Sequence, residues 1–127
     1  MNRFDRKSGE YLGIKPIEKE GEAAYRWNWD APLFISQHQN TRLYFGANKV
    51  FRTDDRGNTW KAISGDLSRQ VDRNKLEVMG IVWSVDAIAK NGSTDIFGQT
   101  TTIAESKLDE NILWVGTDDG LINTTIS

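Results

Sequence analysis

One pattern of residues occurs twice in this 127-residue chain, 70 positions apart, and it constrains the fold more than any other feature. Leu43-Tyr44-Phe45-Gly46 in the first copy corresponds to Leu113-Trp114-Val115-Gly116 in the second copy. A polar turn precedes each segment and begins at Ser36 in one copy and at Ser106 in the other. A repeat of this size indicates a modular architecture in which neighbouring units bury one another's apolar faces.

Short runs of β-branched and aromatic residues, separated by Gly, Asn and Asp, predict strands along most of the chain. Short connections between these runs favour antiparallel neighbours. Helical periodicity is scarce, and we expect only one short helical turn, around 66–70. The sequence therefore predicts an all-β fold. The expected strands are 2–5, 10–14, 32–36, 42–46, 50–53, 59–63, 100–105, 112–117 and 121–125, and 81–89 is either a strand or an ordered connection.

The expected strands group as two, then four, then three. Repeated four-stranded antiparallel units are typical of β-propeller blades, so we expect an incomplete propeller. A solenoid or a sandwich also contains repeated short strands, and topology alone leaves these alternatives open. The predicted parts are 1–24 (the last hairpin of a preceding blade plus a linker), 25–66 (a complete blade), 67–99 (an inter-blade connection) and 100–127 (three strands of a following blade).

Composition excludes several classes of function. The chain has 16 basic and 18 acidic side chains, and this balance argues against a nucleic-acid partner, which needs clustered Lys and Arg. Cysteine is absent, which excludes disulfides and thiolate metal sites. No apolar run has the length of a membrane span, and no signal peptide is visible at the charged N-terminus. The single His38 has no second His or Asp/Ser partner nearby, so we predict no metal, cofactor or catalytic triad.

The motif that most limits the family is Thr53-Asp54-Asp55-Arg56-Gly57-Asn58-Thr59-Trp60. It fits the pattern Ser/Thr-x-Asp-x-Gly-x-Ser/Thr-Trp at all five fixed positions. Gly57 can adopt a positive φ in a hairpin turn, and the Asp55 carboxylate can accept bonds from turn N–H groups. Trp60 begins the outer strand and can cover apolar surface between neighbouring units. The residues expected to build this turn are Thr53, Asp55, Gly57, Thr59 and Trp60.

The motif resembles the Asp-box, or BNR repeat, of sialidase-like and sortilin-like propellers. Phrases outside the box, such as Val115-Gly116-Thr117-Asp118-Asp119-Gly120, are similar to large bacterial BNR-repeat proteins described as glycosyl hydrolases. The resemblance implies a β-propeller in which the box lies opposite the active site and is structural. It also suggests an extracytoplasmic location, which nothing else in the sequence supports.

The resemblance further implies that ligands bind around the central channel, which the inter-unit connections and some strand turns reach. Tryptophan rings beside amides and carboxylates suit a sugar, because the ring covers C–H surface while polar groups bond hydroxyls. The alternative is that these tryptophans wedge between blades, and that Asp118 and Asp119 cap turns. The candidate ligand-binding residues are Trp27, Asn28, Trp29, Asn48 and Trp83.

Asp30 and Asp86 begin successive units and are the candidate catalytic carboxylates. Usual glycoside hydrolysis needs two carboxylates about 5–10 Å apart in one cleft. The arginines are scattered, which argues against the arginine cluster of sialidase chemistry. Because a propeller active site draws residues from around the ring, we expect little or no catalysis from this chain by itself.

A closed propeller needs about four to eight blades. We therefore expect the remaining blades to come from a longer chain or from self-association. The sequence favours a binding or scaffold module with a carbohydrate or peptide ligand. The alternatives are part of a carbohydrate-active glycoside hydrolase and a sortilin-like propeller that binds an extended peptide.

Overall fold

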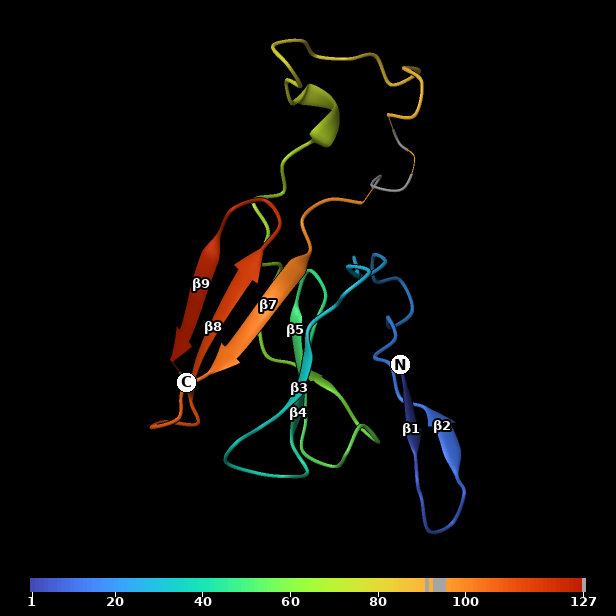
Figure 1. Ribbon diagram of the computed structural model, residues 1–127, viewed down its shortest axis with the longest axis vertical. Coiled ribbons are helices and arrows are strands. Elements are labelled where there is room, and N and C mark those ends of the chain that lie inside the picture. The colour runs from blue at the N-terminus through green and yellow to red at the C-terminus, as the bar shows by residue number, and fades with distance from the viewer. Residues whose placement is uncertain (91, 93–95, 127) are drawn as a thin grey trace.

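The protein folds into three antiparallel β-sheets in a computed structural model that describes residues 1–90, 92 and 96–126 (Figure 1). The first sheet is a two-stranded hairpin, the second has four strands and the third has three, and each follows chain order. One 3₁₀ turn, η1 (Arg73–Lys75), is the only helical element of the described part. The strands are β1 (Asn2–Phe4), β2 (Tyr11–Gly13), β3 (Leu33–Ile35), β4 (Leu43–Gly46), β5 (Val50–Thr53), β6 (Lys61–Ala62), β7 (Thr100–Glu105), β8 (Ile112–Thr117) and β9 (Ile122–Ile126).

The predicted all-β fold and its antiparallel strands are confirmed. The expected helical turn at 66–70 is wrong, because the Asp66 carboxylate accepts the backbone N–H and the hydroxyl of Ser68 and closes a local turn instead. The helical turn occurs at η1, where the Asp72 side chain accepts the N–H of Asn74. The stretch 81–89 is a connection rather than a strand, and residues 91 and 93–95 of the predicted connection 67–99 lie outside the described residues.

The repeat is visible in strand register. Phe34 pairs with Tyr44 in the second sheet, and Ala104 pairs with Trp114 at the same place in the third sheet. After the next turn the correspondence shifts by two residues. Ile122, which pairs with Gly116, therefore matches Val50, which pairs with Gly46. The two copies therefore share the first three strands, and the second copy has a turn between its last two strands that is longer by two residues.

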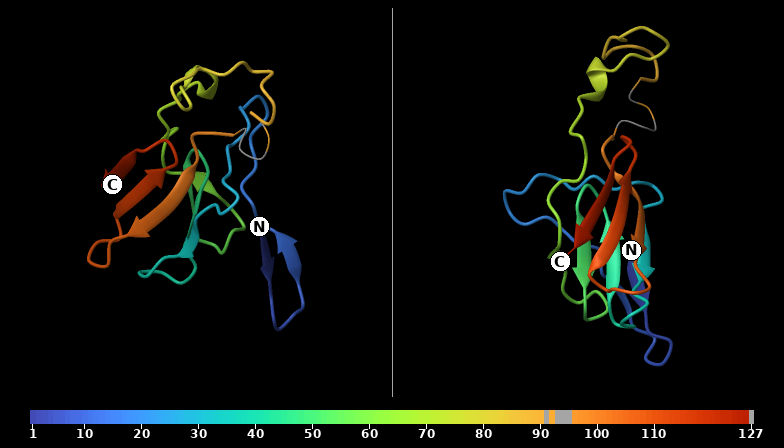
Figure 2. Two further views of the ribbon diagram at one scale, coloured as in Figure 1. Left: turned by 45° about the horizontal axis from the view of Figure 1, so that its top comes forward. Right: turned by 90° about the vertical axis from the view of Figure 1, so that its left-hand side faces the viewer.

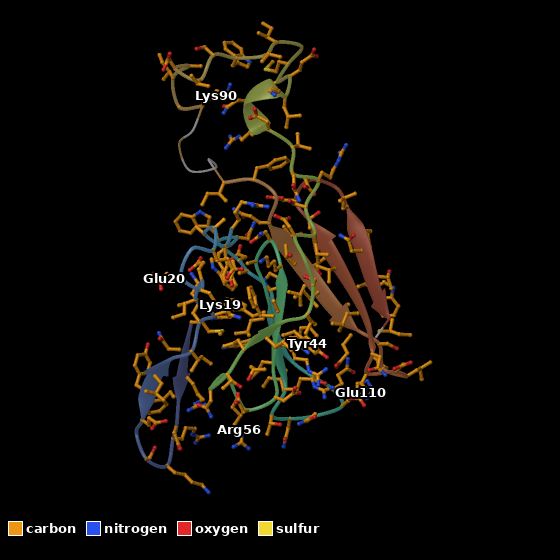
Figure 3. All side chains as sticks on the ribbon, turned by 180° about the vertical axis from the view of Figure 1, so that it is seen from behind. Lys19, Glu20, Tyr44, Arg56, Lys90 and Glu110 are labelled. Carbon is orange, nitrogen blue, oxygen red and sulfur yellow. The ribbon has the colours of Figure 1, made fainter. Side chains whose placement is uncertain are left out.

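The third sheet packs against one face of the second sheet (Figure 2). Tyr44 and Val50 of the second sheet form a buried cluster with Leu113 and Val115 of the third. Gly46 permits this approach, because a Cβ at that position would meet Thr100 Cγ2 at 2.8 Å. Figure 3 shows Tyr44 between the two sheets.

A set of polar contacts, here called the latch, joins the two sheets at one end. The Glu105 carboxylate accepts the Ser36 hydroxyl at 2.7 Å and the Gln37 backbone N–H at 2.8 Å. His38 Nε2 lies 2.7 Å from the carbonyl oxygen of Ser106. Glu105 and Ser36 are both buried, so the carboxylate is paired by protein groups rather than by bulk water.

The opposite face of the second sheet is covered by the chain that leads into it. Trp27 packs on Phe45 and Phe51, with ring centroids 4.3 and 5.9 Å apart. Tyr25 lies 4.8 Å from Phe51 by the same measure. The second sheet is thus covered on both faces, as an inner layer of a stacked β structure would be.

Candidate functional site

The turn between β5 and β6 has the geometry that the Asp-box motif predicts. The Asp55 carboxylate accepts the hydroxyls of Thr53 and Thr59, both at 2.6 Å, and the N–H of Thr59 at 2.9 Å. These hydrogen bonds lower the pKa of Asp55 to about 2, and the bond from Thr53 has the largest effect. Gly57 has a φ of 87° and donates its N–H to the Thr53 hydroxyl. Both oxygens of the Asp55 carboxylate thus accept hydrogen bonds from within the turn.

The Asp-box turn also holds the N-terminal hairpin. Trp60 donates its indole N–H to the carbonyl oxygen of Ile14 at 2.6 Å. A Cβ on Gly57 would meet Ile14 Cδ1 at 2.7 Å, so glycine is required for this contact as well as for the turn. Arg3 of β1 donates to the carbonyl oxygen of Arg56 and to the side chain of Asn58. The box therefore works as an attachment point between neighbouring sheets.

The N-terminal hairpin has the same cross-strand spacing as the Asp-box hairpin. Asn2 pairs with Gly13, as Phe51 pairs with Ala62, with a separation of 11 residues in each pair. Arg3 and Arg52 occupy equivalent places in the middle of their strands. The two hairpins therefore have the same register relative to their turns.

Two turns place side chains on the connections that enter the sheets. Asn48 is buried, accepts the backbone N–H of Arg26 at 3.1 Å and donates to Asp66 at 3.0 Å. Asp118, 70 residues later, accepts the N–H groups of Gly98 and Gln99 at 2.9 and 2.8 Å. Asn48 therefore caps a connection in this structure, and Asp118 caps the next one.

The candidate ligand-binding residues before β3 have different surroundings. Trp27 is half-buried in the aromatic cluster, and Lys15 Nζ lies 4.8 Å from its ring centroid. The Asn28 side chain accepts the N–H of Asp30 and closes a local turn. Trp29 is 92% exposed, and within the described residues the Asp30 carboxylate has no hydrogen-bond or ion-pair partner. Trp29 and the neighbouring candidate catalytic carboxylate Asp30 are thus open to a ligand.

The candidates after β6 lie on the long connection that extends away from the sheets, where Figure 3 labels Lys90. Trp83 donates its indole N–H to the carbonyl oxygen of Val78 at 3.0 Å, and Lys90 Nζ donates to the carbonyl oxygen of Trp83. Trp83 lines an apolar hollow of about 680 Å³ in this connection. Asp86 is exposed and does not line it. The hollow is lined by Arg73, Leu76, Glu77, Val78, Trp83, Ala87, Ile88, Lys90 and Phe97.

A larger hollow of about 870 Å³ lies between the N-terminal segment and the β5–β6 hairpin. Tyr25, Phe51 and Trp60 form its aromatic wall, and Lys19 and Glu22 are among its charged residues. Neither Asp30 nor Asp86 lines this hollow or the one in the connection. The structure therefore does not bring the two candidate carboxylates into one of these two hollows.

Sequence reasoning missed an ion pair that anchors the entry to the first unit. Arg26 donates to Asp66 at 2.8 Å, to Ser68 at 2.9 Å and to the carbonyl oxygen of Gly98 at 3.2 Å. It also missed Glu105, and the repeat held no signal for it. Ile35, at the matching position of the first copy, is 58% exposed, whereas Glu105 is buried in the latch.

The described residues contain no cluster of three or more His, Asp or Glu side chains able to hold a metal ion. Within the same part of the chain, no helix is both long and apolar enough to cross a bilayer. Comparison with family models, with curated proteins and with solved structures finds no match to this chain.

Proposed function

We propose that this chain forms consecutive blades of a BNR/Asp-box β-propeller and serves as a binding or scaffold module without catalysis of its own. The observation that carries the proposal is the repetition of hydrogen bonds at a spacing of 70 residues. Ser36 donates its N–H to the carbonyl oxygen of Arg42, as Ser106 does to that of Ile112. The Ser36 hydroxyl accepts the N–H of His38, as the Ser106 hydroxyl accepts that of Leu108.

The packing of the units supports a propeller over an unrelated arrangement of hairpins. The second sheet carries the third sheet on one face, and its Asp-box turn holds the N-terminal hairpin. Successive units of a propeller contact only their neighbours in this way. The order of strands within each sheet follows the chain, as it does in a propeller blade.

A scaffold role is favoured because several candidate ligand-binding residues are used inside the fold. Asn48 and Trp27 stabilise the entry to the first unit, and Asn28 closes a local turn. Trp29 and Trp83 are the candidate aromatics with exposed faces, at 92% and 46%. A ligand of the proposed module would therefore contact the connections rather than the sheets.

The test is a titration of the 127-residue chain with neutral oligosaccharides and with an extended peptide, in which tryptophan fluorescence reports binding. A parallel assay measures the release of phenol from aryl glycosides. We expect saturable binding that weakens at least about threefold in Trp29→Ala, while Trp114→Ala behaves as the parent. We expect no glycoside turnover. Turnover that disappears in Asp30→Asn or Asp86→Asn would overturn the non-catalytic role and favour the glycoside hydrolase alternative. Displacement of a bound peptide by a sugar would favour a carbohydrate site over a peptide site.

A further inference from the structure

One face of the third sheet is exposed, apart from Gly116, although the matching face of the second sheet is largely buried. We call it the Trp114 face; it comprises Ala104, Trp114, Gly116, Ile122 and Thr124. Their counterparts in the second sheet are Phe34, Tyr44, Gly46, Val50 and Arg52.

The difference in exposure is large at the two central positions. Tyr44 is 1% exposed and Val50 2%, whereas Trp114 is 42% and Ile122 80% exposed. Trp114 beside Ala104 replaces Tyr44 beside Phe34, so a larger ring stands next to a smaller neighbour. An exposed indole and an exposed isoleucine on adjacent strands are unusual for a sheet face that meets only water.

We propose that the Trp114 face binds a further antiparallel β-sheet of the same repeat, carried in tandem with this one, and that a carboxylate of that sheet binds at Ser106. The inference rests on the proposed propeller function and adds the partner of this face. The occupant is defined by what covers the matching face of the second sheet: an aliphatic row of Ile103, Leu113 and Val115.

The carboxylate follows from the latch. Glu105 accepts the Ser36 hydroxyl and the Gln37 N–H, and the repeat places Ser106 and Lys107 at the same positions of the next unit. The Ser106 hydroxyl accepts the N–H groups of Leu108 and Asp109, but it donates to no acceptor among the described residues. A hydroxyl proton and a backbone N–H are therefore available for an incoming Glu or Asp.

A second copy of this chain is a poor occupant. The surface that it would have to present is the other face of its second sheet, where Phe45 and Phe51 are already covered by Trp27 and Tyr25. At the position of Glu105 that sheet has Ile35, which offers no carboxylate to Ser106. A further unit that resembles the third sheet fits better, because it has an aliphatic face and a carboxylate at the position of Glu105.

The experiment extends the chain by one unit of its own sequence. Residues 1–125 are followed directly by residues 54–127, because Thr125 and Thr53 hold equivalent register positions. The appended segment then supplies an Asp-box hairpin and a second copy of β7–β8–β9. The chain has no cysteine, so Ala104→Cys in the first copy gives a single thiol on the Trp114 face, and Lys7→Cys in the N-terminal hairpin gives an exposed control.

We expect the Ala104→Cys thiol to react with a maleimide at least about tenfold more slowly in the extended chain than in the 127-residue chain, with no change at Lys7→Cys. Glu105→Gln in the appended copy removes the carboxylate and should restore much of the rate, whereas Glu110→Gln in the same copy should not. Equal rates in the extended and parent chains would overturn the proposal. Rapid hydrogen exchange throughout the appended strands would overturn it too, because docking on the Trp114 face is what should order them.

Two further measurements distinguish a second copy from a tandem unit, and this inference from the proposed function. A protected thiol in the 127-residue chain, together with a dimer in light scattering, would identify a second copy as the occupant and overturn the tandem unit. Hydrogen exchange of β4 in the parent chain reports on the existing contact between the second and third sheets. Slow exchange there with an unprotected Ala104→Cys thiol would reject only this inference, whereas fast exchange would reject the proposed function itself.

Discussion

The second and third sheets are two copies of one unit, and they differ in what their equivalent residues touch. Tyr44 is enclosed by the third sheet, while Trp114 at the same position has no sheet over it among the described residues. The order of the first three strands and most of their register are nevertheless the same. The difference teaches that strand formation is local to each unit, whereas burial of the faces depends on the neighbour.

The turns show the same division between local and non-local effects. Ser36 and Ser106 each accept backbone N–H groups of the turn that follows them. Only Ser36 also donates its hydroxyl to a carboxylate of the next sheet. A single residue type therefore supports a local turn in both units and an inter-sheet contact in one.

Truncation of the two equivalent aromatic residues should give the largest contrast. Tyr44→Ala leaves a cavity between two sheets and should lower the free energy of unfolding by about 3–5 kcal/mol. Trp114→Ala removes a side chain that is 42% exposed and should lower it by about 1 kcal/mol or less. Urea denaturation of both variants measures the difference. Equal losses would mean that Trp114 is as enclosed as Tyr44 in solution, and would contradict the difference in burial between the two sheets.

The Asp-box turn, for which the third sheet has no described equivalent, should show its own pH dependence. The pKa of Asp55 is lowered to about 2 by its hydrogen bonds from Thr53 and Thr59. A carboxyl group with a lowered pKa stabilises the fold above its unfolded value near 4, and this contribution is lost as the pH falls from about 4 to 2. Asp55→Asn should therefore destabilise the chain at pH 6 and reduce the stability difference between pH 6 and pH 2.5.

Thermal unfolding of the parent chain, Asp55→Asn and Asp30→Asn at the two pH values provides the measurement. Asp30 is exposed and its carboxylate has no partner within the described residues, so its variant is the matched control. A pH profile of Asp55→Asn that follows the parent would exclude Asp55 as the source of the effect.

Local patterns predicted most of the fold. Strands 50–53, 100–105 and 112–117 were expected with the bounds that the structure shows, because β-branched and aromatic runs end at turn residues there. The Asp-box turn was also predictable, since its hydrogen bonds join residues within one motif. The turn at Asp66 was not, because its carboxylate, besides capping Ser68, also binds Arg26 and Asn48, which are distant in sequence.

The candidate site was less predictable than the fold. Sequence position places Trp27 and Trp29 on one connection, but only the structure shows that Trp27 packs on Phe45 while Trp29 faces water. The same limit applies to Glu105, whose role depends on a residue 69 positions away. Whether a polar or aromatic side chain is used inside the fold or left for a ligand is a property of packing, which periodicity and spacing do not specify.

The smallest contrast that we expect comes from the two equivalent serines. Ser36→Ala removes two interactions, the turn contact to His38 and the bond to the buried Glu105 carboxylate, and should cost about 1–3 kcal/mol of stability. Ser106→Ala removes only contacts within its own turn and should cost about 1 kcal/mol or less.

A double-mutant cycle of Ser36→Ala with Glu105→Gln, measured by chemical denaturation, isolates the inter-sheet part of this cost, and Ser106→Ala with Glu105→Gln is its control. Additive losses in both cycles would contradict the latch, whereas coupling in the Ser36 cycle alone would show that the carboxylate, and not the turn, distinguishes the two copies.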